Sequence, residues 1–338
     1  MIAGIFGLLV AAGLFVSNSN LISGLLFPPI LLLAAALAPL LAVSWFTRQC
    51  ANGLTWRQAS LAFAGGATLG ILAALVLEIV FPAIVLVLVF NLAEIATRSI
   101  EELFTALAGE NIAAAVTSPG FIYILIQVAI VAPVAEELAK PLATLAVISR
   151  LSRRDAFLVG AMAGAGFATV ENVLYAGFGF HFWAGILMVR ALGGAVHPLG
   201  SGLVALGWRD VLRGEPKVWR NWLTRFGMAA GMHALWNGGS LLVITLAGAQ
   251  FFGELPPEID VLGLSAAGTT LALLIILGLV ALWLGGSIAQ NMESTAGRDQ
   301  QPVAANFTLS NRSIAIWALT CLVAIVPAGI TGLQLLMR

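Results

Sequence analysis

Charged residues are scarce in this sequence, and they make up only 9% of its 338 residues, against about 25% in an ordinary soluble domain. Neither sign is in excess, because 16 Lys and Arg residues balance 16 Asp and Glu residues, so no nucleic acid partner is expected. The two cysteines, Cys50 and Cys321, provide no disulfide framework. Together these shortages exclude a soluble globular enzyme, a disordered chain and a coiled coil.

Long apolar runs occupy most of the chain, since 60% of the residues are hydrophobic and the mean hydropathy is +1.00. A helix needs about 20 apolar residues to cross a bilayer. The runs therefore predict an all-α fold, a polytopic integral membrane helical bundle of eight to nine transmembrane helices. The expected spans are 2–16, 24–46, 58–80, 121–148, 156–178, 184–207, 226–249, 262–284 and 314–336. The first of these is short, which accounts for the range in the expected count.

Basic residues are distributed unequally between the two sets of loops. One set of alternate loops holds 12 of the 16 Lys and Arg residues, whereas the opposite set holds only Arg98 and Arg338. By the positive-inside rule, the first set is cytoplasmic, and the N-terminus lies on the same side. A separate crossing by the apolar residues 81–96 would move every later loop to the opposite side and destroy this asymmetry, so we expect none. These features predict a multi-pass protein of the plasma (inner) membrane, with the lipid bilayer as its surroundings.

Seven ionisable residues interrupt the apolar character of the spans. A charged side chain at the centre of a bilayer costs about 2.5–3.5 kcal/mol, so the Glu, Lys and Arg residues among the seven would cost on the order of 15 kcal/mol if unpaired. All seven fall in four consecutive spans, whereas Glu78 falls near a predicted helix end. The seven are Glu136, Glu137, Lys140, Glu171, Arg190, His197 and His233. We therefore expect them to converge, to pair or to face water.

This distribution divides a single membrane domain, 1–338, into three parts. Residues 1–117 hold the N-terminal spans and an amphipathic segment that faces outward. Residues 118–249 form a four-helix core that carries the candidate catalytic residues. Residues 250–338 supply two packing spans.

Helical spacing places further polar side chains beside the seven. Lys140 lies three residues after Glu137 and four after Glu136, so it can reach both carboxylates. Asn237 lies one turn after His233 on the same helix face. The same spacing adds Phe167, Asn172 and Ser201 as supporting residues. Each feature alone has a structural interpretation, a buried ion pair or an interhelical hydrogen bond. Their combination exceeds what structural pairing requires.

Four short motifs are similar to those of the PrsW family of intramembrane proteases. The four are Ala132–Lys140 with its acidic pair, Gly166–Tyr175 with Phe-x-x-x-Glu-Asn, Arg190 with His197 and Ser201, and His233–Asn237 with His-x-x-x-Asn. The resemblance implies an endopeptidase that hydrolyses peptide bonds of membrane-bound proteins, as in site-one cleavage of anti-sigma factors. It also implies kinship with the CAAX prenyl endopeptidases and the abortive-infection proteases. The expected partner is a single-span membrane protein substrate.

The candidate catalytic residues allow two mechanisms of hydrolysis. Their spacing along the chain does not distinguish between the two. In the first interpretation no metal is needed. Glu136 and Glu171 share a proton and activate water, while Lys140 holds Glu137 or Glu136 ionised. His233 and Asn237 stabilise the oxyanion in that mechanism, His197 orients the water or donates to the leaving group, and Arg190 neutralises Glu171. In the alternative, one zinc ion is held by Glu171, His197 and His233, and Glu136 is the base.

A second class of function also uses buried carboxylates. A proton- or cation-coupled transporter would employ Glu136 and its neighbours as a relay. Such transporters usually show inverted repeats and paired broken helices, and the sequence has neither. A non-catalytic chaperone or immunity factor with the protease fold is a third possibility.

Overall fold

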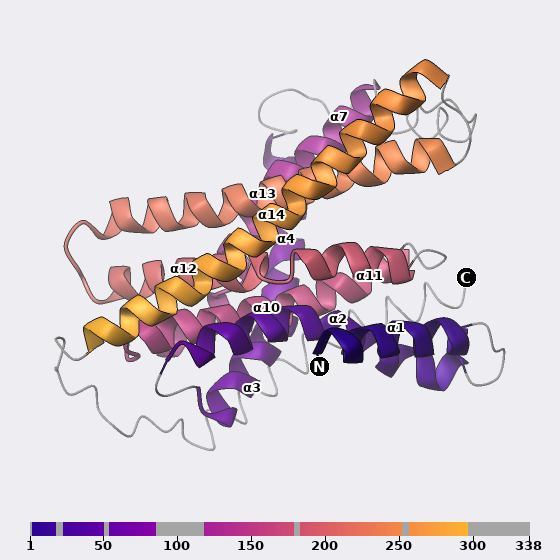
Figure 1. The fold of residues 1–338 in the computed structure, drawn as a ribbon. Helices are drawn as coiled ribbons and strands as arrows, with labels where there is room; N and C mark the ends of the chain where they lie inside the picture. The colour runs from indigo at the N-terminus through magenta and orange to yellow at the C-terminus, as the bar shows by residue number, and fades with distance from the viewer. Residues whose placement is uncertain are drawn as a thin grey trace.

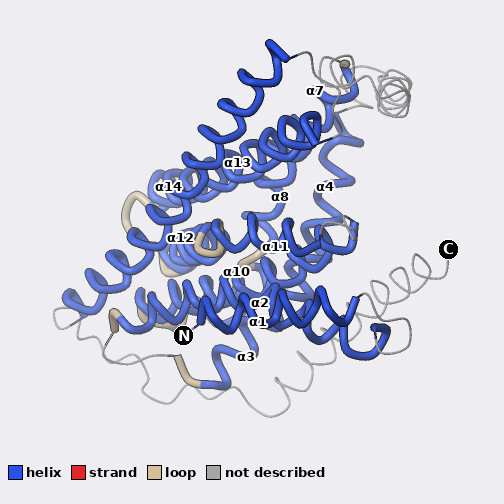
Figure 2. Tube along the Cα trace, turned by 45° about the vertical axis from the view of Figure 1, so that its right-hand side comes forward, coloured by secondary structure: helices blue, strands red, loops and turns tan. Residues whose placement is uncertain are grey.

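The computed structural model describes residues 2–17, 23–50, 54–85, 118–178, 183–251 and 257–296. Within these ranges every regular element is helical and no strand is present (Figure 1, Figure 2). The prediction of an all-α fold is therefore confirmed. The expected span 314–336 and the amphipathic segment 97–117 lie outside the described residues.

The N-terminal part contains three of the expected spans. Helices α1 (Ile2–Ser17) and α2 (Ser23–Arg48) lie side by side. The third span is continuous through α3 (Trp56–Gly65), the π-helical turn η1 (Gly66–Gly70) and α4 (Ile71–Val85). It runs past its expected end at residue 80, and Pro82 lies inside α4.

The expected span 121–148 is built from five short helical segments. They are α7 (Pro119–Ile126), the π-helical turn η3 (Gln127–Val131), α8 (Ala132–Ala139), the 3-10 turn η4 (Leu142–Thr144) and α9 (Leu145–Ile148). The α-helix ends before Pro141 because a proline has no backbone N–H to continue the hydrogen-bond ladder. Lys140 therefore lies at the end of α8, beside the break.

Helix α10 (Arg153–Phe178) lies in the middle of the bundle and packs against α2, α3, α11 and α12. The contact with α12 is close because of Gly164. A Cβ atom at that position would lie 2.5 Å from the His197 carbonyl oxygen and 2.6 Å from the Ser201 hydroxyl. Glycine thus lets two helices that carry site residues approach each other at backbone distance.

The expected span 184–207 is not one straight helix. It consists of α11 (Trp183–Leu192) and α12 (Val196–Leu212), which meet at an angle of 49°. The break falls at the Gly193–Gly194 pair, which has little helix propensity. A Cβ atom on Gly193 would lie 2.3 Å from the Trp236 ring, so this backbone is pressed against the next helix. The bend positions Arg190 and His197 on different segments of one polypeptide.

The last two described helices are longer than expected. Helix α13 (Val218–Phe251) crosses α14 (Pro257–Ala296) at one edge of the bundle (Figure 1). By length and hydropathy, five described helical segments can cross a membrane, and the bent α11–α12 pair makes a sixth. The five are Phe27–Arg48, Trp56–Ile84, Pro119–Ile148, Arg153–Gly177 and Ser265–Met292. The described residues support a helical membrane bundle but do not establish eight to nine spans.

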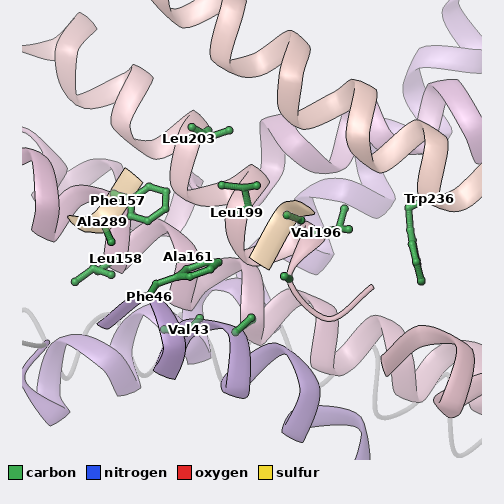
Figure 3. Packing of buried hydrophobic residues seen from close by; sticks show 14 of the residues in the cluster. Val43, Phe46, Phe157, Leu158, Ala161, Val196, Leu199, Leu203, Trp236 and Ala289 are labelled. Carbon is green, nitrogen blue, oxygen red and sulfur yellow. The ribbon is translucent and has the colours of Figure 1, made fainter. Parts of the chain in front are cut away.

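An apolar core joins five of the helices next to the site (Figure 3). It combines large side chains with small ones that fit between them. Its members include Val43, Phe46, Phe157, Leu158, Ala161, Val196, Leu199, Leu203, Trp236 and Ala289. Burial of Phe46, Phe157 and Trp236 is almost complete. This packing fixes α10, α12 and α13 relative to one another, so the polar residues on them are held in place.

Candidate active site

Five neighbouring segments carry the site residues that the sequence predicts, and all of these side chains are buried. They are Glu136, Glu137 and Lys140 at α8, Phe167, Glu171 and Asn172 on α10, Arg190 on α11, His197 and Ser201 on α12, and His233 and Asn237 on α13. Polar groups buried in this way need partners from other helices. The contacts between them therefore define the chemistry of the site.

Lys140 lies between the two adjacent glutamates, as their spacing predicts. Its Nζ atom is 2.7 Å from Oε1 of Glu137 and 3.2 Å from Oε2 of Glu136. The ammonium group also lies over the ring of Phe167, at 4.6 Å from its centroid. A single buried cation thus balances part of the charge of two buried carboxylates.

His233 contacts both glutamates through different ring nitrogens. Its Nδ1 atom lies 3.1 Å from Oε1 of Glu137, and its Nε2 atom lies 3.6 Å from Oε2 of Glu136. Nδ1 is also 3.3 Å from Nζ of Lys140, but an ammonium group cannot accept a hydrogen bond. When the Nδ1–H group donates to Glu137, the Nε2 atom carries no proton, and its lone pair is directed toward Glu136.

Glu136, His197 and His233 offer three potential ligand atoms that lie within 4.8 Å of one another. The two imidazole rings meet edge to face, with centroids 4.5 Å apart. Neither nitrogen of His197 nor Nε2 of His233 forms a hydrogen bond with any described residue, although all three are buried. The group differs from the expected zinc ligands, because Glu136 takes the place of Glu171.

Glu171 lies at the edge of this group and is fixed by Arg190. Its Oε2 atom is 2.8 Å from Nη2 of Arg190 and 3.2 Å from Nε2 of His197. Arg190 also donates from Nε to the side-chain oxygen of Asn172, and the amide of Asn172 donates to the Ala35 carbonyl at 3.0 Å. The expected pairing of Arg190 with Glu171 is thus present. Asn172 connects it to the backbone of α2.

Asn237 and Ser201 belong to the surroundings of the group. Asn237 donates from Nδ2 to the carbonyl oxygen of Val128 at 3.3 Å. This carbonyl lacks its own helical donor. The N–H group of Ala132 donates to the carbonyl of Gln127, five residues before it, instead of to that of Val128. In the same pattern the donor to Val128 would be Pro133, which has no N–H. Ser201 packs beside α10, and its hydroxyl forms no hydrogen bond within the described residues.

Two residues near the site were not expected from the sequence. The side-chain amide of Gln127 donates to the carbonyl of Glu78 at 3.3 Å, where Pro82 cannot donate. The carboxylate of Glu78 lies in the middle of α4, half-buried, and interacts electrostatically with Glu136. Its expected place at a helix end is wrong because α4 continues to Val85. Two signals in the sequence could have identified the contact between Gln127 and Glu78. One is a glutamine within an apolar run, and the other is a proline four residues after a glutamate.

The three close ligand atoms fit a divalent transition metal. Two imidazole nitrogens and one carboxylate oxygen are typical ligands of catalytic zinc, which keeps a further position for water. Both nitrogens of His197 and Nε2 of His233 form no hydrogen bond within the described residues, so a lone pair of each ring is available to an ion. The Glu137–His233 contact also matches the carboxylate–histidine pairs that orient metal-binding imidazoles.

Comparison with known proteins is consistent with this arrangement. The PrsW family model, described as an intramembrane metalloprotease family, matches residues 54–259, which is more than half of the chain and includes every site residue named above. No curated protein and no solved structure matches the chain. The chain therefore belongs to the PrsW family of intramembrane metalloproteases.

Proposed function

We propose that this protein hydrolyses a peptide bond in a single-span membrane protein, at a metal site formed by Glu136, His197 and His233. The observation that carries the proposal is the convergence of these three side chains, with ligand atoms within 4.8 Å. Buried imidazole nitrogens that form no hydrogen bond are costly in a membrane protein, so those of His197 and His233 favour a bound ligand. Membership of the family supports a protease in general terms.

Zinc is the ion that the ligand set suits best. When bound, it supplies an acidified water and polarises the substrate carbonyl. This assignment replaces our first, metal-free interpretation, and it makes Glu136 a ligand instead of the general base. The change follows from the position of Glu136, which lies beside His233, whereas Glu171 is paired with Arg190.

Glu137 acts on the site through His233, and Lys140 acts on it through the two glutamates. The carboxylate of Glu137 accepts a hydrogen bond from Nδ1 and so holds the ring with Nε2 toward Glu136. Lys140 neutralises Glu137 at 2.7 Å, which allows the carboxylate to remain buried. We assign both as positioning residues, because Glu137 orients His233 and Lys140 holds the carboxylates of Glu137 and Glu136 in place.

Glu171 is the residue we assign to proton transfer. Its carboxylate lies 3.2 Å from His197 and outside the group of three ligand atoms. It accepts a proton from the attacking water and then gives it to the nitrogen of the departing amine. Arg190, braced by Asn172, keeps the carboxylate in this position. Asn237, whose amide is bonded to Val128, is assigned to holding η3 and α8 together with α13.

The proposed substrate follows from the depth of the site and from the family resemblance. A peptide bond becomes accessible in the bilayer only where the substrate helix is unwound, because a helix hides its own backbone. A single-span protein of the anti-sigma-factor type meets this requirement with one unwound segment. The buried polar groups around Glu136 offer hydrogen-bond partners to the exposed backbone of such a segment.

The test uses the full chain reconstituted with a single-span membrane substrate. Glu136→Gln keeps the shape of the side chain but removes a charged ligand, so cleavage should fall to background and bound zinc should be lost. Glu215→Gln removes a partly exposed carboxylate and Leu138→Val is an apolar change next to the pair. Both controls should keep most of the activity.

Thermal stability is measured on the same samples, because a purely structural ion pair predicts a different result. Removing one partner of the Glu136–Lys140 pair would then lower stability at least as much as activity. A stable Glu136→Gln protein that cleaves at the original rate would refute the proposal. Proton flux that depends on Glu136, without any cleavage, would instead favour the transporter.

A further inference from the structure

Three arginines converge on one buried aspartate at the end of the bundle opposite the Trp183 end of α11, where α10 begins and α12 ends. Asp210 is 2% exposed. Its Oδ1 atom lies 2.9 Å from Arg153 and 3.0 Å from Arg209, and its Oδ2 atom lies 2.7 Å from Arg225. The cluster therefore ties together α10, α12 and α13, which also carry Glu171, His197 and His233.

Among the described residues, the positive charge of this cluster exceeds the negative charge that faces it. Asp210 balances one of the three guanidinium groups. Glu215, whose side chain is 41% exposed, lies 3.9 Å from Arg209. Asp155 is paired with a different residue, Arg154. The Arg209 and Arg225 side chains are 5% and 17% exposed, whereas Arg153 is 37% exposed. The surplus guanidinium charge is therefore partly withdrawn from water but still accessible at Arg153, and such a group favours a bound anion.

Aromatic side chains surround the same end of α12 and α13. The ring of Trp222 lies 5.3 Å from Trp208 and is stacked on Phe226 at 5.0 Å, between centroids. The indole nitrogens of Trp208 and Trp222 are buried and have no hydrogen-bond acceptor among the described residues. Trp222 precedes Arg225 by three residues, so both lie on one face of α13. Tryptophan is enriched at the level of lipid headgroups.

We propose that this cluster binds the phosphate group of an anionic phospholipid. The guanidinium groups of Arg153 and Arg225 contact the phosphate oxygens, and the Trp222 indole donates a further hydrogen bond. Guanidinium forks suit phosphate geometry, and the tryptophans place the site at the membrane–water boundary. The neighbouring side chains Leu212 and Leu223 are 51% and 59% exposed, which provides apolar surface for the acyl chains.

Lipid bound in this way adds a further anion to the cluster of three arginines and Asp210. It offsets the surplus charge of Arg209 and its neighbours and so strengthens the junction of three helices. Because these helices also carry the proposed metal and proton-transfer residues, their relative positions depend on the lipid. The cluster lies on parts of α10, α12 and α13 that are remote from the site. The inference therefore does not depend on the proposed protease mechanism.

The experiment titrates the full-length protein in neutral detergent with dioleoylphosphatidylglycerol and counts retained lipid by native mass spectrometry. Dioleoylphosphatidylcholine and inorganic phosphate are the comparison probes. Arg225→Gln should weaken retention of the anionic lipid about fivefold, since a basic residue near a lipid surface contributes about that factor. Arg220→Gln, an equal loss of charge at an exposed position of the same helix, should change it little.

Trp222→Phe keeps the aromatic stack but removes the indole N–H, so it tests the site even if Arg225→Gln does not fold. It should also weaken retention. Equal losses in Arg220→Gln and Arg225→Gln, or equal retention of phosphatidylcholine, would show non-specific attraction and overturn the proposal. Displacement of the lipid by millimolar inorganic phosphate would overturn the assignment to a lipid, and so would unchanged retention in both Arg225→Gln and Trp222→Phe.

Discussion

The orientation of His233 is determined by a single carboxylate. Glu137 faces Nδ1 of the imidazole at 3.1 Å, and this leaves Nε2 directed toward Glu136. The adjacent glutamates therefore have different tasks although they are neighbours in the sequence. One contributes to the candidate ligand group, and the other fixes the tautomer and the ring of a second member of that group.

Glu137→Gln tests this division. A glutamine amide keeps the volume but accepts the Nδ1–H hydrogen bond less strongly, so metal affinity or activity should fall about 10- to 100-fold. Zinc affinity is measured by competition with a chelator, and cleavage is measured in parallel. Glu215→Gln serves again as the control. If zinc affinity in Glu137→Gln equals that of the original protein while cleavage falls, Glu137 acts on the reaction in another way.

The sequence identifies the members of the site better than their partners. Glu136, His197 and His233 could be selected because ionisable residues are costly within apolar spans. Which carboxylate accompanies the two histidines depends on the rotation of α8 and α10 about their axes, and spacing along the chain does not determine that. The contact of Asn237 with Val128 was missed for a related reason, since it exists only because η3 is π-helical next to Pro133.

At the scale of helices, side-chain amides replace the N–H groups that two prolines lack. Gln127 donates to the Glu78 carbonyl, which Pro82 leaves without a donor, and Asn237 does the same for Val128 near Pro133. Water is not present to solvate such carbonyls in a bilayer, so each needs a donor from the protein. The two amides link α4 to η3 and η3 to α13 around the helix that carries the acidic pair.

The link between α4 and η3 can be measured with a double-mutant cycle. Gln127→Leu leaves the Glu78 carbonyl unpaired and should lower the free energy of unfolding by about 1–3 kcal/mol. Pro82→Ala restores a backbone N–H at the position where the α4 ladder lacks one. In that background Gln127→Leu should cost clearly less, as read from denaturant unfolding of the purified protein. Equal costs in both backgrounds would show that the amide does not compensate for the proline.

Element boundaries could be predicted where apolar length alone decides them, as in α2 and α10. The division of 184–207 into α11 and α12 could not, although Gly193 and Gly194 weaken the helix there. A glycine pair is compatible with a continuous membrane helix, so spacing alone does not predict the 49° bend, and Gly193 packs against the Trp236 ring at the break. Similarly, α4 extends past residue 80 because Gln127 satisfies the carbonyl that Pro82 frees.

At the scale of the whole molecule, a cluster of basic residues distinguishes one end of the bundle. Arg153, Arg209 and Arg225 meet at one end, where they converge on Asp210. The site lies deeper, among residues with almost no exposure. From the loop asymmetry in the sequence, the positive-inside rule predicts that the arginine end faces the cytoplasm.

The orientation of the molecule is tested by labelling engineered cysteines in intact cells. In a background with Cys50→Ser and Cys321→Ser, Ser152→Cys reports on the loop before α10 and Glu258→Cys on the beginning of α14. We expect a membrane-impermeant maleimide to label Glu258→Cys from outside and Ser152→Cys only after the cells are opened, because the loops around 150–154 and 209–225 hold 8 of the 16 basic residues. Labelling of both positions from one side would contradict the topology. Labelling of Ser152→Cys from outside would also place the arginine cluster in the outer leaflet, where anionic lipid is less abundant, and so remove its expected ligand.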